Sequence, residues 1–334
     1  MLTNKTILVT GGTGSFGKCF TKYVLDHYDV KKIIIYSRDE FKQWMMEKEF
    51  RGYQKGYEDK LRFFIGDVRD AERFKRACYG VDYIIHAAAL KQVPACEYNP
   101  NEAIKTNING AMNVIDAALD CGVKKVVALS TDKAVNPVNL YGGTKLVSDK
   151  LFIAANAYAG SKDINFSVVR YGNVAGSRGS IIPLFNSIIK NGGTELPITD
   201  YRMTRFWISL TQGVDLVIKA LTEANGGETF ISKIPSFKIT DLAEAMLPGC
   251  KMPEIGIREG EKLHEIMVTV EDSMTTYEYD KHYIVYPQMV WNDKQQPIPG
   301  GKKVEYGFSY SSDNNTEWLT VEEIRELLKT IDLE

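Results

Sequence analysis

The sequence predicts an α/β protein built on a Rossmann-type doubly wound parallel sheet, with a smaller mixed substrate-binding lobe. The first observation is that short apolar runs alternate with helical patterns along the first half of the chain, which is typical of parallel strands joined by helices. The second is a glycine-rich turn between the first apolar run and the first helical pattern. The third is a change after Arg170, where the pattern becomes irregular and richer in Gly, Pro and aromatic residues. We expect the lobe to begin there.

The elements follow in order from these patterns. We expect six parallel strands near residues 5, 32, 61, 82, 125 and 165, with helices between them. Residues 211–224 predict a further helix, and residues 229–231 predict a late strand that returns to the main sheet. Residues 320–331 predict a terminal helix, because Thr320 can cap it and Glu323 stands three positions later, as in a capping box.

The first apolar run, residues 5–10, leads into the glycine-rich turn and then into an amphipathic segment that ends near residue 27. A strand, such a turn and a helix in this order are typical of dinucleotide-binding folds. Gly11 would allow the tight turn, Gly14 would let backbone amides approach a pyrophosphate, and Gly17 would permit close packing of the helix on the strand. The residues expected to contact a dinucleotide here are Gly11, Thr13, Gly14, Ser15, Phe16 and Gly17.

The second strand ends at Ser37 and Arg38, where an NAD-selective site usually presents an acidic residue to the ribose hydroxyls. The Arg38 guanidinium, helped by Ser37 and Lys42, would instead pair with a 2′-phosphate. The sequence therefore favours NADP as the cofactor. The alternative is a solvated Arg38 with Asp39 as the ribose ligand.

Two later strands end in residues that suit the rest of the cofactor. Asp67 and Val68 follow the third strand, where they would meet the adenine. Ala87 and Ala88 end the fourth strand and are small enough to lie against the cofactor, although plain core packing is an alternative for them. The predicted units are an NADP-binding Rossmann domain over 1–171 plus about 206–233, a substrate lobe over about 172–205 and 234–300, and a C-terminal segment over 301–334.

Polar side chains follow the fifth strand, which the continuous apolar run at residues 126–129 predicts because parallel strands covered on both faces lack alternation. Thr131, Asp132 and Lys133 come next, at the edge of the sheet where ligands bind in such folds. Tyr141 and Lys145 are one helical turn apart and share a face, so the ammonium would favour the phenolate and make Tyr141 a base. A Tyr-x-x-x-Lys pattern also arises by chance in many helices, but its place after the fifth strand favours catalysis.

The composition excludes several classes of function. The chain has 334 residues with 41 basic and 43 acidic side chains, so it offers no field that would attract nucleic acid or an anionic membrane. No apolar run has transmembrane length and no secretory signal opens the sequence, so we expect a soluble cytoplasmic protein. Five scattered cysteines and four isolated histidines show no metal-ligand spacing, so we expect reduced thiols and no metal.

In this order the motifs resemble those of the extended short-chain dehydrogenases/reductases over nearly the whole chain. The segment Ser130-Thr131-Asp132-Lys133-Ala134-Val135-Asn136-Pro137 is similar to that of the inverting UDP-N-acetylglucosamine 4,6-dehydratases of the pseudaminic-acid pathway. Glucose-type dehydratases carry Glu where Lys133 stands, and membrane-anchored retaining relatives lack the equivalent of Tyr141. The resemblance implies UDP-N-acetylglucosamine as substrate, tightly bound NADP that is regenerated in each cycle, a homo-oligomer such as a hexamer, and a product used in flagellin glycosylation.

The resemblance also implies five substrate contacts, which are Asn173 at the sugar diphosphate, Arg205 and Arg258 at its phosphates, Glu261 at the uridine ribose and, as a weaker candidate, Lys91. Two arginines suit a diphosphate because a planar guanidinium can bind phosphate oxygens bidentately. Salt bridges with Glu259 or Glu265 are the alternative for these arginines.

The implied reaction begins with oxidation at carbon 4 of the sugar. Tyr141 takes the hydroxyl proton, Thr131 hydrogen-bonds the same hydroxyl, and Lys145 holds the ribose of the cofactor. Water is then eliminated across carbons 5 and 6, with Lys133 as the base and Asp132 as the acid. These roles require burial to keep the amine neutral and the carboxyl protonated, and the two titrations would be coupled. The alternatives are a UDP-sugar 4-epimerase and a non-catalytic NADP-sensing protein, neither of which needs an acid and an amine at these positions.

Overall fold

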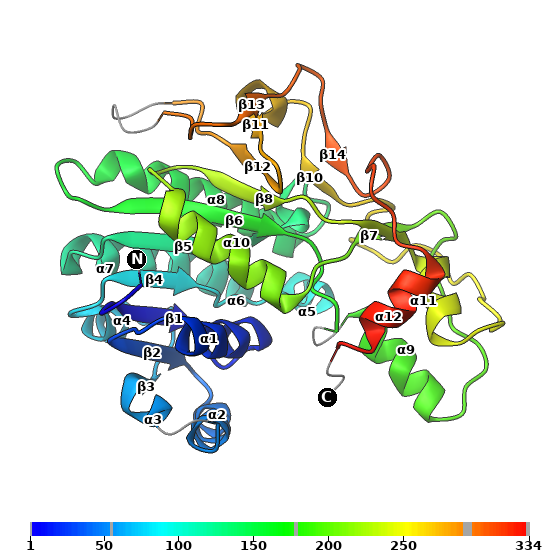
Figure 1. Cartoon of the computed structure of the whole chain (residues 1–334), viewed down its shortest axis with the longest axis horizontal. Coiled ribbons are helices and arrows are strands. Elements are labelled where there is room, and N and C mark those ends of the chain that lie inside the picture. Colours follow the sequence, from blue (N-terminus) through cyan, green and yellow to red (C-terminus); the bar gives the residue numbers. More distant parts are fainter. Residues whose placement is uncertain (1, 54–55, 177–179, 290–295, 332–334) are drawn as a thin grey trace.

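The computed structural model describes residues 2–53, 56–176, 180–289 and 296–331. At its centre is a mostly parallel sheet of ten strands with helices on both faces (Figure 1). Seven of these strands run parallel to one another: β1 (Thr6–Thr10), β2 (Lys32–Ser37), β3 (Leu61–Ile65), β4 (Tyr83–His86), β5 (Lys125–Thr131), β6 (Asn165–Tyr171) and β8 (Thr229–Ser232). They stand where the apolar runs predicted strands, which confirms the fold class.

Three further strands extend one edge of the sheet: β12 (His282–Val285), β11 (Thr276–Glu278) and β13 (Lys302–Lys303). β12 pairs antiparallel with β8, β11 with β12, and β13 with β11. The complete order is β13-β11-β12-β8-β6-β5-β4-β1-β2-β3. Residues 276–285 therefore belong to the main sheet, although the sequence analysis placed them in the lobe. Antiparallel neighbours need no crossover helix between them, so the strand–helix alternation that marked the parallel strands is missing here.

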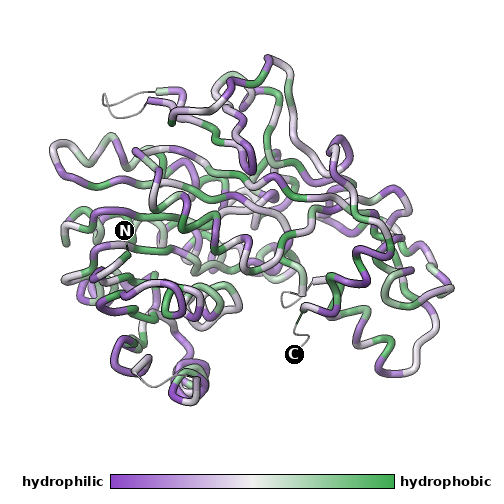
Figure 2. The backbone as a smooth tube through the Cα atoms, in the orientation of Figure 1, coloured by the Kyte–Doolittle hydropathy of each residue, from purple (hydrophilic) through white to green (hydrophobic). Residues whose placement is uncertain are grey.

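Two layers of helices cover the sheet. One face carries α1 (Ser15–His27), α2 (Glu40–Arg51), α3 (Tyr57–Lys60) and α10 (Leu210–Glu223), and the other carries α4 (Ala71–Cys78), α7 (Gly110–Cys121) and α8 (Leu140–Tyr158). Within β1, Ile7 and Val9 pack under the first layer and Leu8 under the second, because successive strand residues face opposite sides. Hydrophobic stretches accordingly run along the central strands in Figure 2.

The smaller lobe has a hydrophobic core of its own, which includes Phe185, Trp207, Leu242 and Ile324. Its main elements are α9 (Ile181–Lys190), α11 (Ile239–Met246), α12 (Val321–Leu328) and the antiparallel pair of β7 (Thr204–Phe206) with β9 (Ser236–Lys238). α12 is the predicted terminal helix, and Thr320 and Glu323 form the expected capping box. The lobe lies to the right of the sheet in Figure 1.

Short elements complete the frame around the sheet. They are α5 (Val93–Tyr98), α6 (Pro100–Ile104), the π-helix η1 (Lys105–Asn109), the 3-10 turns η2 (Asp132–Ala134) and η3 (Asp272–Thr275), and the antiparallel pair of β10 (Ile266–Val268) with β14 (Tyr310–Ser311). Asn107 of η1 donates to Thr144 Oγ1 at 2.9 Å and accepts from the Leu90 amide at 2.8 Å, so it ties the loop after β4 to α8. No helix in the described part of the chain combines the length and apolar composition needed to span a membrane.

Candidate active site

A deep cleft of about 1150 Å³ lies between the carboxyl ends of the parallel strands and the lobe. Its lining includes every residue that the sequence analysis assigned to the cofactor and to the substrate, namely Gly11, Thr13, Gly14, Ser15, Phe16, Gly17, Ser37, Arg38, Lys42, Asp67, Val68, Ala87, Ala88, Lys91, Tyr141, Lys145, Asn173, Arg205, Arg258 and Glu261. Thr131 and Lys133 also line it. Asp132 has no exposed surface and lies behind the wall of the cleft rather than on it.

The glycine-rich turn has the geometry of an anion site. Gly11 takes the left-handed conformation with φ of 63°, and a Cβ at Gly17 would clash with the Gly12 carbonyl group. Gly14 is the N-cap of α1, with no side chain bonded to the cap and no acidic residue in the first turn. The first amides of α1 thus face the cleft without a side-chain partner, which is the arrangement that binds a pyrophosphate.

The end of β2 distinguishes the two possible ribose ligands. The Asp39 carboxylate accepts from the Lys42 amide at 2.9 Å as the N-cap of α2, and the Lys42 ammonium lies 3.2 Å from it. Asp39 therefore already has two partners. The half-exposed Arg38 guanidinium lies 3.7 Å from Asp67 at the rim of the cleft, and Thr13 and Ser37 exchange a 2.8 Å hydrogen bond beside it.

Thr10 and His86 are buried next to Ala87 and Ala88, which line the cleft, and the sequence analysis missed both. The Thr10 hydroxyl accepts from the amides of Ala87 and Ala88 at 3.1 Å each, so its own hydrogen is directed at His86 Nδ1, 2.9 Å away. Burial, and then the charge of Lys145, lower the pKa of His86 to about 3, and the ring stays neutral. This contact fixes the two alanines. The only sequence signal was a pair of polar residues at adjacent strand ends, in register at the ends of β1 and β4.

The polar segment after β5 forms a compact cluster around one ammonium group. The Lys133 Nζ donates to Asp132 Oδ1 at 3.1 Å and to Asn173 Oδ1 at 3.0 Å, and it lies 3.3 Å from Glu265 Oε1. The Thr131 hydroxyl donates to the same Asp132 oxygen at 2.8 Å. The second Asp132 oxygen, Oδ2, is buried and has no hydrogen-bond partner in the described residues. A Cβ at Gly172, which lines the cleft, would lie 3.2 Å from it.

The proposed acid–base roles set two conditions on this cluster, and its electrostatics in the free protein agree with one of them but not with the other. Burial and the neighbouring Glu265 carboxylate raise the pKa of Asp132, as the proposed acid requires. Burial alone would lower the pKa of Lys133, but the carboxylates of Asp132 and Glu265 outweigh it and raise that pKa. The condition that burial keep the Lys133 amine neutral is therefore not met in the free protein, because Asp132 and Glu265 both stabilise the charged form.

Tyr141 and Lys145 lie side by side on α8 and are both buried. Burial raises the pKa of Tyr141 to about 12, and the cation that opposes this rise most is Lys133, not Lys145 as the sequence analysis expected. Burial lowers the pKa of Lys145, although the nearby Asp149 carboxylate acts against it. Asp149 itself is buried and accepts from the Ser130 hydroxyl at 2.5 Å. This hydrogen bond joins α8 to β5 behind the site. No sequence motif indicated Asp149.

The substrate-side residues divide into two groups. The Arg205 guanidinium donates to the carbonyls of Thr204 and Leu263 at 2.7 and 3.1 Å and lies 3.8 Å from Glu265, so the salt-bridge alternative describes its state in the free protein. Arg258 and Glu261 lie at the rim of the cleft in a loop that Asn139, the N-cap of α8, holds by donating to the Gly260 carbonyl at 2.7 Å. Glu261 Oε2 is buried without a hydrogen-bond partner in the described residues, as an oxygen reserved for a ligand would be.

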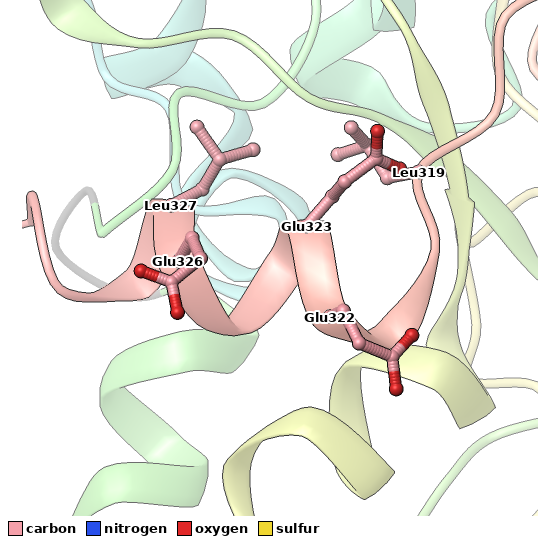
Figure 3. Close-up of a pocket in the computed structure, with 5 residues that line it drawn as sticks. All are labelled: Leu319, Glu322, Glu323, Glu326 and Leu327. Carbon is pink, nitrogen blue, oxygen red and sulfur yellow. The ribbon is translucent and has the colours of Figure 1, made fainter.

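A second hollow, of about 450 Å³, lies on α12 and is lined by Leu319, Glu322, Glu323, Glu326 and Leu327. Figure 3 shows the three carboxylates around it. A surface with three acidic groups and no basic one disfavours a nucleotide or a diphosphate. The deep cleft is therefore the candidate active site.

Comparison with known proteins identifies a family, curated relatives and a solved structure that are similar to nearly the whole chain. The polysaccharide biosynthesis protein family matches residues 7–287. The UDP-N-acetylglucosamine 4,6-dehydratase (inverting) of Campylobacter jejuni is 56% identical, with 98% of each chain covered. A UDP-glucose 4-epimerase of Rickettsia canadensis is 43% identical over 99% of this chain and 97% of its own. Among solved structures, Pen from Bacillus thuringiensis is 38% identical with a TM-score of 0.89, over 99% of this chain and 98% of that chain.

Proposed function

Because the chain belongs to the polysaccharide biosynthesis protein family, we propose that it is an NADP-dependent UDP-N-acetylglucosamine 4,6-dehydratase of the inverting type, a hydro-lyase. One observation carries the proposal: the buried cluster of Asp132, Lys133 and Glu265 adjoins Tyr141 in the same cleft as the glycine-rich turn. Oxidation requires a base such as the Tyr141 phenol, and the elimination of water that follows requires an acid and an amine beside it.

The residues of the cleft fit a dinucleotide with a nicotinamide end. The open amides of α1 would hold the pyrophosphate, Asp67 and Val68 the adenine, and Ala87 and Ala88 would lie against the cofactor. Arg38, with Ser37 and Lys42, would hold the 2′-phosphate of NADP, since Asp39 is occupied by its helix cap. When bound, the nicotinamide supplies a hydride acceptor for carbon 4 and later a hydride donor for carbon 6.

In the oxidation step Tyr141 takes the proton of the hydroxyl on carbon 4. Thr131 hydrogen-bonds the same hydroxyl, and Lys145 holds the ribose of the cofactor, so both act by positioning and by charge. The free Tyr141 phenol has a pKa of about 12, so the cations around it must lower that pKa in the complex. Lys133 already does so in the free protein.

In the elimination step Lys133 removes the proton from carbon 5 and Asp132 protonates the departing hydroxyl. Lys133 must first pass a proton on, and two carboxylates lie within reach, Asp132 at 3.1 Å and Glu265 at 3.3 Å. Asp132 Oδ2 is buried beside Gly172, where an added Cβ would lie 3.2 Å from it. Arg258, Glu261, Asn173, Lys91 and, after reorientation, Arg205 would hold the UDP moiety.

The finer proposals rest on the similarity of the segment 130–137 to the pseudaminic-acid group. They are a homo-oligomer such as a hexamer in the cytoplasm, a product that enters pseudaminic acid and flagellin glycosylation, and a division into a cofactor domain and a substrate lobe in which residues 276–285 belong to the main sheet.

The test is to incubate the purified protein with UDP-N-acetylglucosamine, without added cofactor, and to follow the sugar by mass spectrometry. We expect a keto-sugar lighter by one water, and none from Tyr141→Phe, which cannot accept the proton. Proton NMR of the product reports the configuration at carbon 5. A product that keeps the configuration of the substrate at this carbon would refute the inverting assignment.

A UDP-sugar 4-epimerase is the second candidate, because relatives with that activity in their names are 43% identical over nearly the whole chain. Epimerisation needs the oxidation at carbon 4 but no acid and base at carbons 5 and 6. The same incubation separates the two activities, since an epimerase yields a sugar of unchanged mass with inverted carbon 4.

A further inference from the structure

Glu265 is a buried carboxylate at the wall of the cleft that no sequence motif marks. Its side chain is 3% exposed, and its backbone is fixed by two hydrogen bonds with Ser312, from the Glu265 amide to Ser312 Oγ at 3.0 Å and from the Ser312 amide to the Glu265 carbonyl at 2.8 Å. The Glu265 backbone is therefore fixed by the segment that follows β14 rather than by the turn after β5.

Its contacts lead to the acid–base pair. Oε1 lies 3.3 Å from Lys133 Nζ and 3.8 Å from Arg205 Nε. Lys133 Nζ in turn contacts Asp132 Oδ1, so one ammonium bridges two buried carboxylates. Glu265 Oε2 and Asp132 Oδ2 are both buried without hydrogen-bond partners in the described residues. Two carboxylates in one desolvated site cannot easily both stay ionised, and one of them retains a proton.

We propose that Glu265 is a positioning residue, which holds Lys133 beside Asp132 and keeps a proton on Asp132 for the proposed dehydration. The charged and titratable groups that face it decide which carboxylate is protonated. Arg205 lies on the Glu265 side, Tyr141 lies on the Asp132 side, and Lys133 lies between the two carboxylates. The Lys262 ammonium donates to the Asp132 carbonyl at 3.4 Å and interacts with both carboxylates. The three cations outweigh burial and lower the pKa of Glu265, whereas burial and the Glu265 charge raise that of Asp132.

With these starting protonation states, the proton transfers of the elimination step balance. The cluster starts with a charged Lys133, a protonated Asp132 and an ionised Glu265. Lys133 gives one proton to Glu265 and takes the proton from carbon 5, whose bonding pair becomes the second bond between carbons 5 and 6. The bond from carbon 6 to oxygen breaks, and Asp132 protonates the oxygen, which leaves as water. The cluster is neutral before and after.

The proposal rests on the proposed function for its role but can be measured without turnover. The probe is the infrared carbonyl band of a protonated carboxyl group, recorded over pH on the substrate-free protein and assigned by its loss in Asp132→Asn. Glu265→Gln removes the negative charge that favours this proton. We expect the band to disappear at a pH lower by about one unit or more than in the wild type. Glu265→Asp retains the negative charge, so its band is expected to disappear close to the wild-type pH, even if the variant is less stable.

Glu228→Gln is the matched control, because Glu228 is equally buried but lies outside the cleft, where it accepts backbone amides. It is expected to lower stability and to leave the Asp132 band unmoved. The same variants are then assayed for dehydration over pH. Glu265→Gln should be slower at every pH, because Lys133 loses its proton acceptor, and its activity should fall off at a pH about one unit lower than that of the wild type.

The outcomes separate this inference from the proposed function. An Asp132 band that titrates identically in Glu265→Gln and in the wild type would overturn the role of Glu265, whatever the enzyme does to the sugar. A shifted band in a protein that leaves the sugar mass unchanged would keep the electrostatic role and refute the dehydratase. If Glu265→Gln does not fold, a band in Glu265→Asp that titrates far from the wild-type pH contradicts the charge effect, because Asp retains the negative charge.

Discussion

Lys133 donates a 3.1 Å hydrogen bond from its ammonium group to Oδ1 of its own neighbour in sequence, Asp132. The backbone allows this because the two residues stand in a 3-10 turn directly after β5. Adjacent residues on a strand point to opposite faces, so the pair could not meet if the strand continued. The turn therefore converts two neighbours in sequence into one acid–base unit.

Asp132→Asn and Lys133→Ala should separate oxidation from dehydration. Neither change removes Tyr141 or the cofactor turn, so addition of substrate should still produce the absorbance of reduced nicotinamide. The oxidation should be slower in Lys133→Ala, because this change also removes the cation that lowers the Tyr141 pKa most. Loss of water should fall about 10²- to 10⁴-fold, the usual contribution of a positioned acid or base. Lys219→Ala, on the surface of α10, removes an amine outside the cleft and serves as control. Undiminished dehydration in Lys133→Ala would assign the base to another group.

Arg38→Ala should change cofactor selectivity. A charge-assisted contact with the 2′-phosphate is worth about 1.5–3 kcal/mol, so the Kd for NADP should rise about 10- to 100-fold while that for NAD changes little. Lys48→Ala is the control, because Lys48 lies on the same α2 helix but packs over Trp44. Calorimetric titration of the cofactor-free protein measures both. If the wild-type protein prefers NAD, Asp39 rather than Arg38 meets the ribose.

Gly142→Ala and Gly143→Ala form a matched pair on one helical turn. A Cβ at Gly142 would collide with the Lys133 carbonyl oxygen and lie 3.0 Å from Pro137, whereas nothing lies within 4 Å of a Cβ at Gly143. Gly142→Ala should displace the turn that carries Asp132 and Lys133 and cost about 1–3 kcal/mol of unfolding free energy. Gly143→Ala should stabilise α8 by about 0.5–1 kcal/mol. Urea unfolding and dehydration assays measure both effects, and equal behaviour of the two variants would refute the close packing.

Much of the site could be predicted because its residues lie at strand ends and helix starts. The glycine turn, Arg38 and the Tyr141-Lys145 pair all sit at such positions, and the cleft contains each of them. Periodicity locates these elements, and a parallel sheet brings their carboxyl ends together. The parallel strands and the capped terminal helix were predictable for the same reason.

Glu265 and His86 could not be predicted from local pattern. Glu265 reaches Lys133 only because β10 pairs with β14 and packs against the turn after β5, a long-range arrangement without a local signature. Together with Asp132, that carboxylate reverses the expected direction of the Lys133 pKa. The antiparallel edge strands were misplaced for a related reason, because short strands resemble the irregular segments of a lobe.

His86 should make the folded protein sensitive to mild acid. Its folded pKa is lowered to about 3 from an unfolded value of about 6.5, so between these values the unfolded chain binds the extra proton. The stability that the neutral ring contributes is complete above the unfolded pKa and is lost as the pH falls. Between about pH 7.5 and pH 5 this amounts to about 2 kcal/mol of unfolding free energy.

Urea unfolding of the wild type and of His86→Asn at both pH values measures this contribution. Asn offers an oxygen in place of Nδ1 to accept from Thr10 but has no proton to gain, so the variant should lose about 2 kcal/mol less than the wild type on acidification. His282, whose pKa burial lowers to about 4, is present in both proteins and cancels in the difference. An equal acid sensitivity of the two proteins would mean that His86 has the same pKa in the folded and unfolded states, and that Thr10 holds Ala87 and Ala88 without needing a neutral ring beside it.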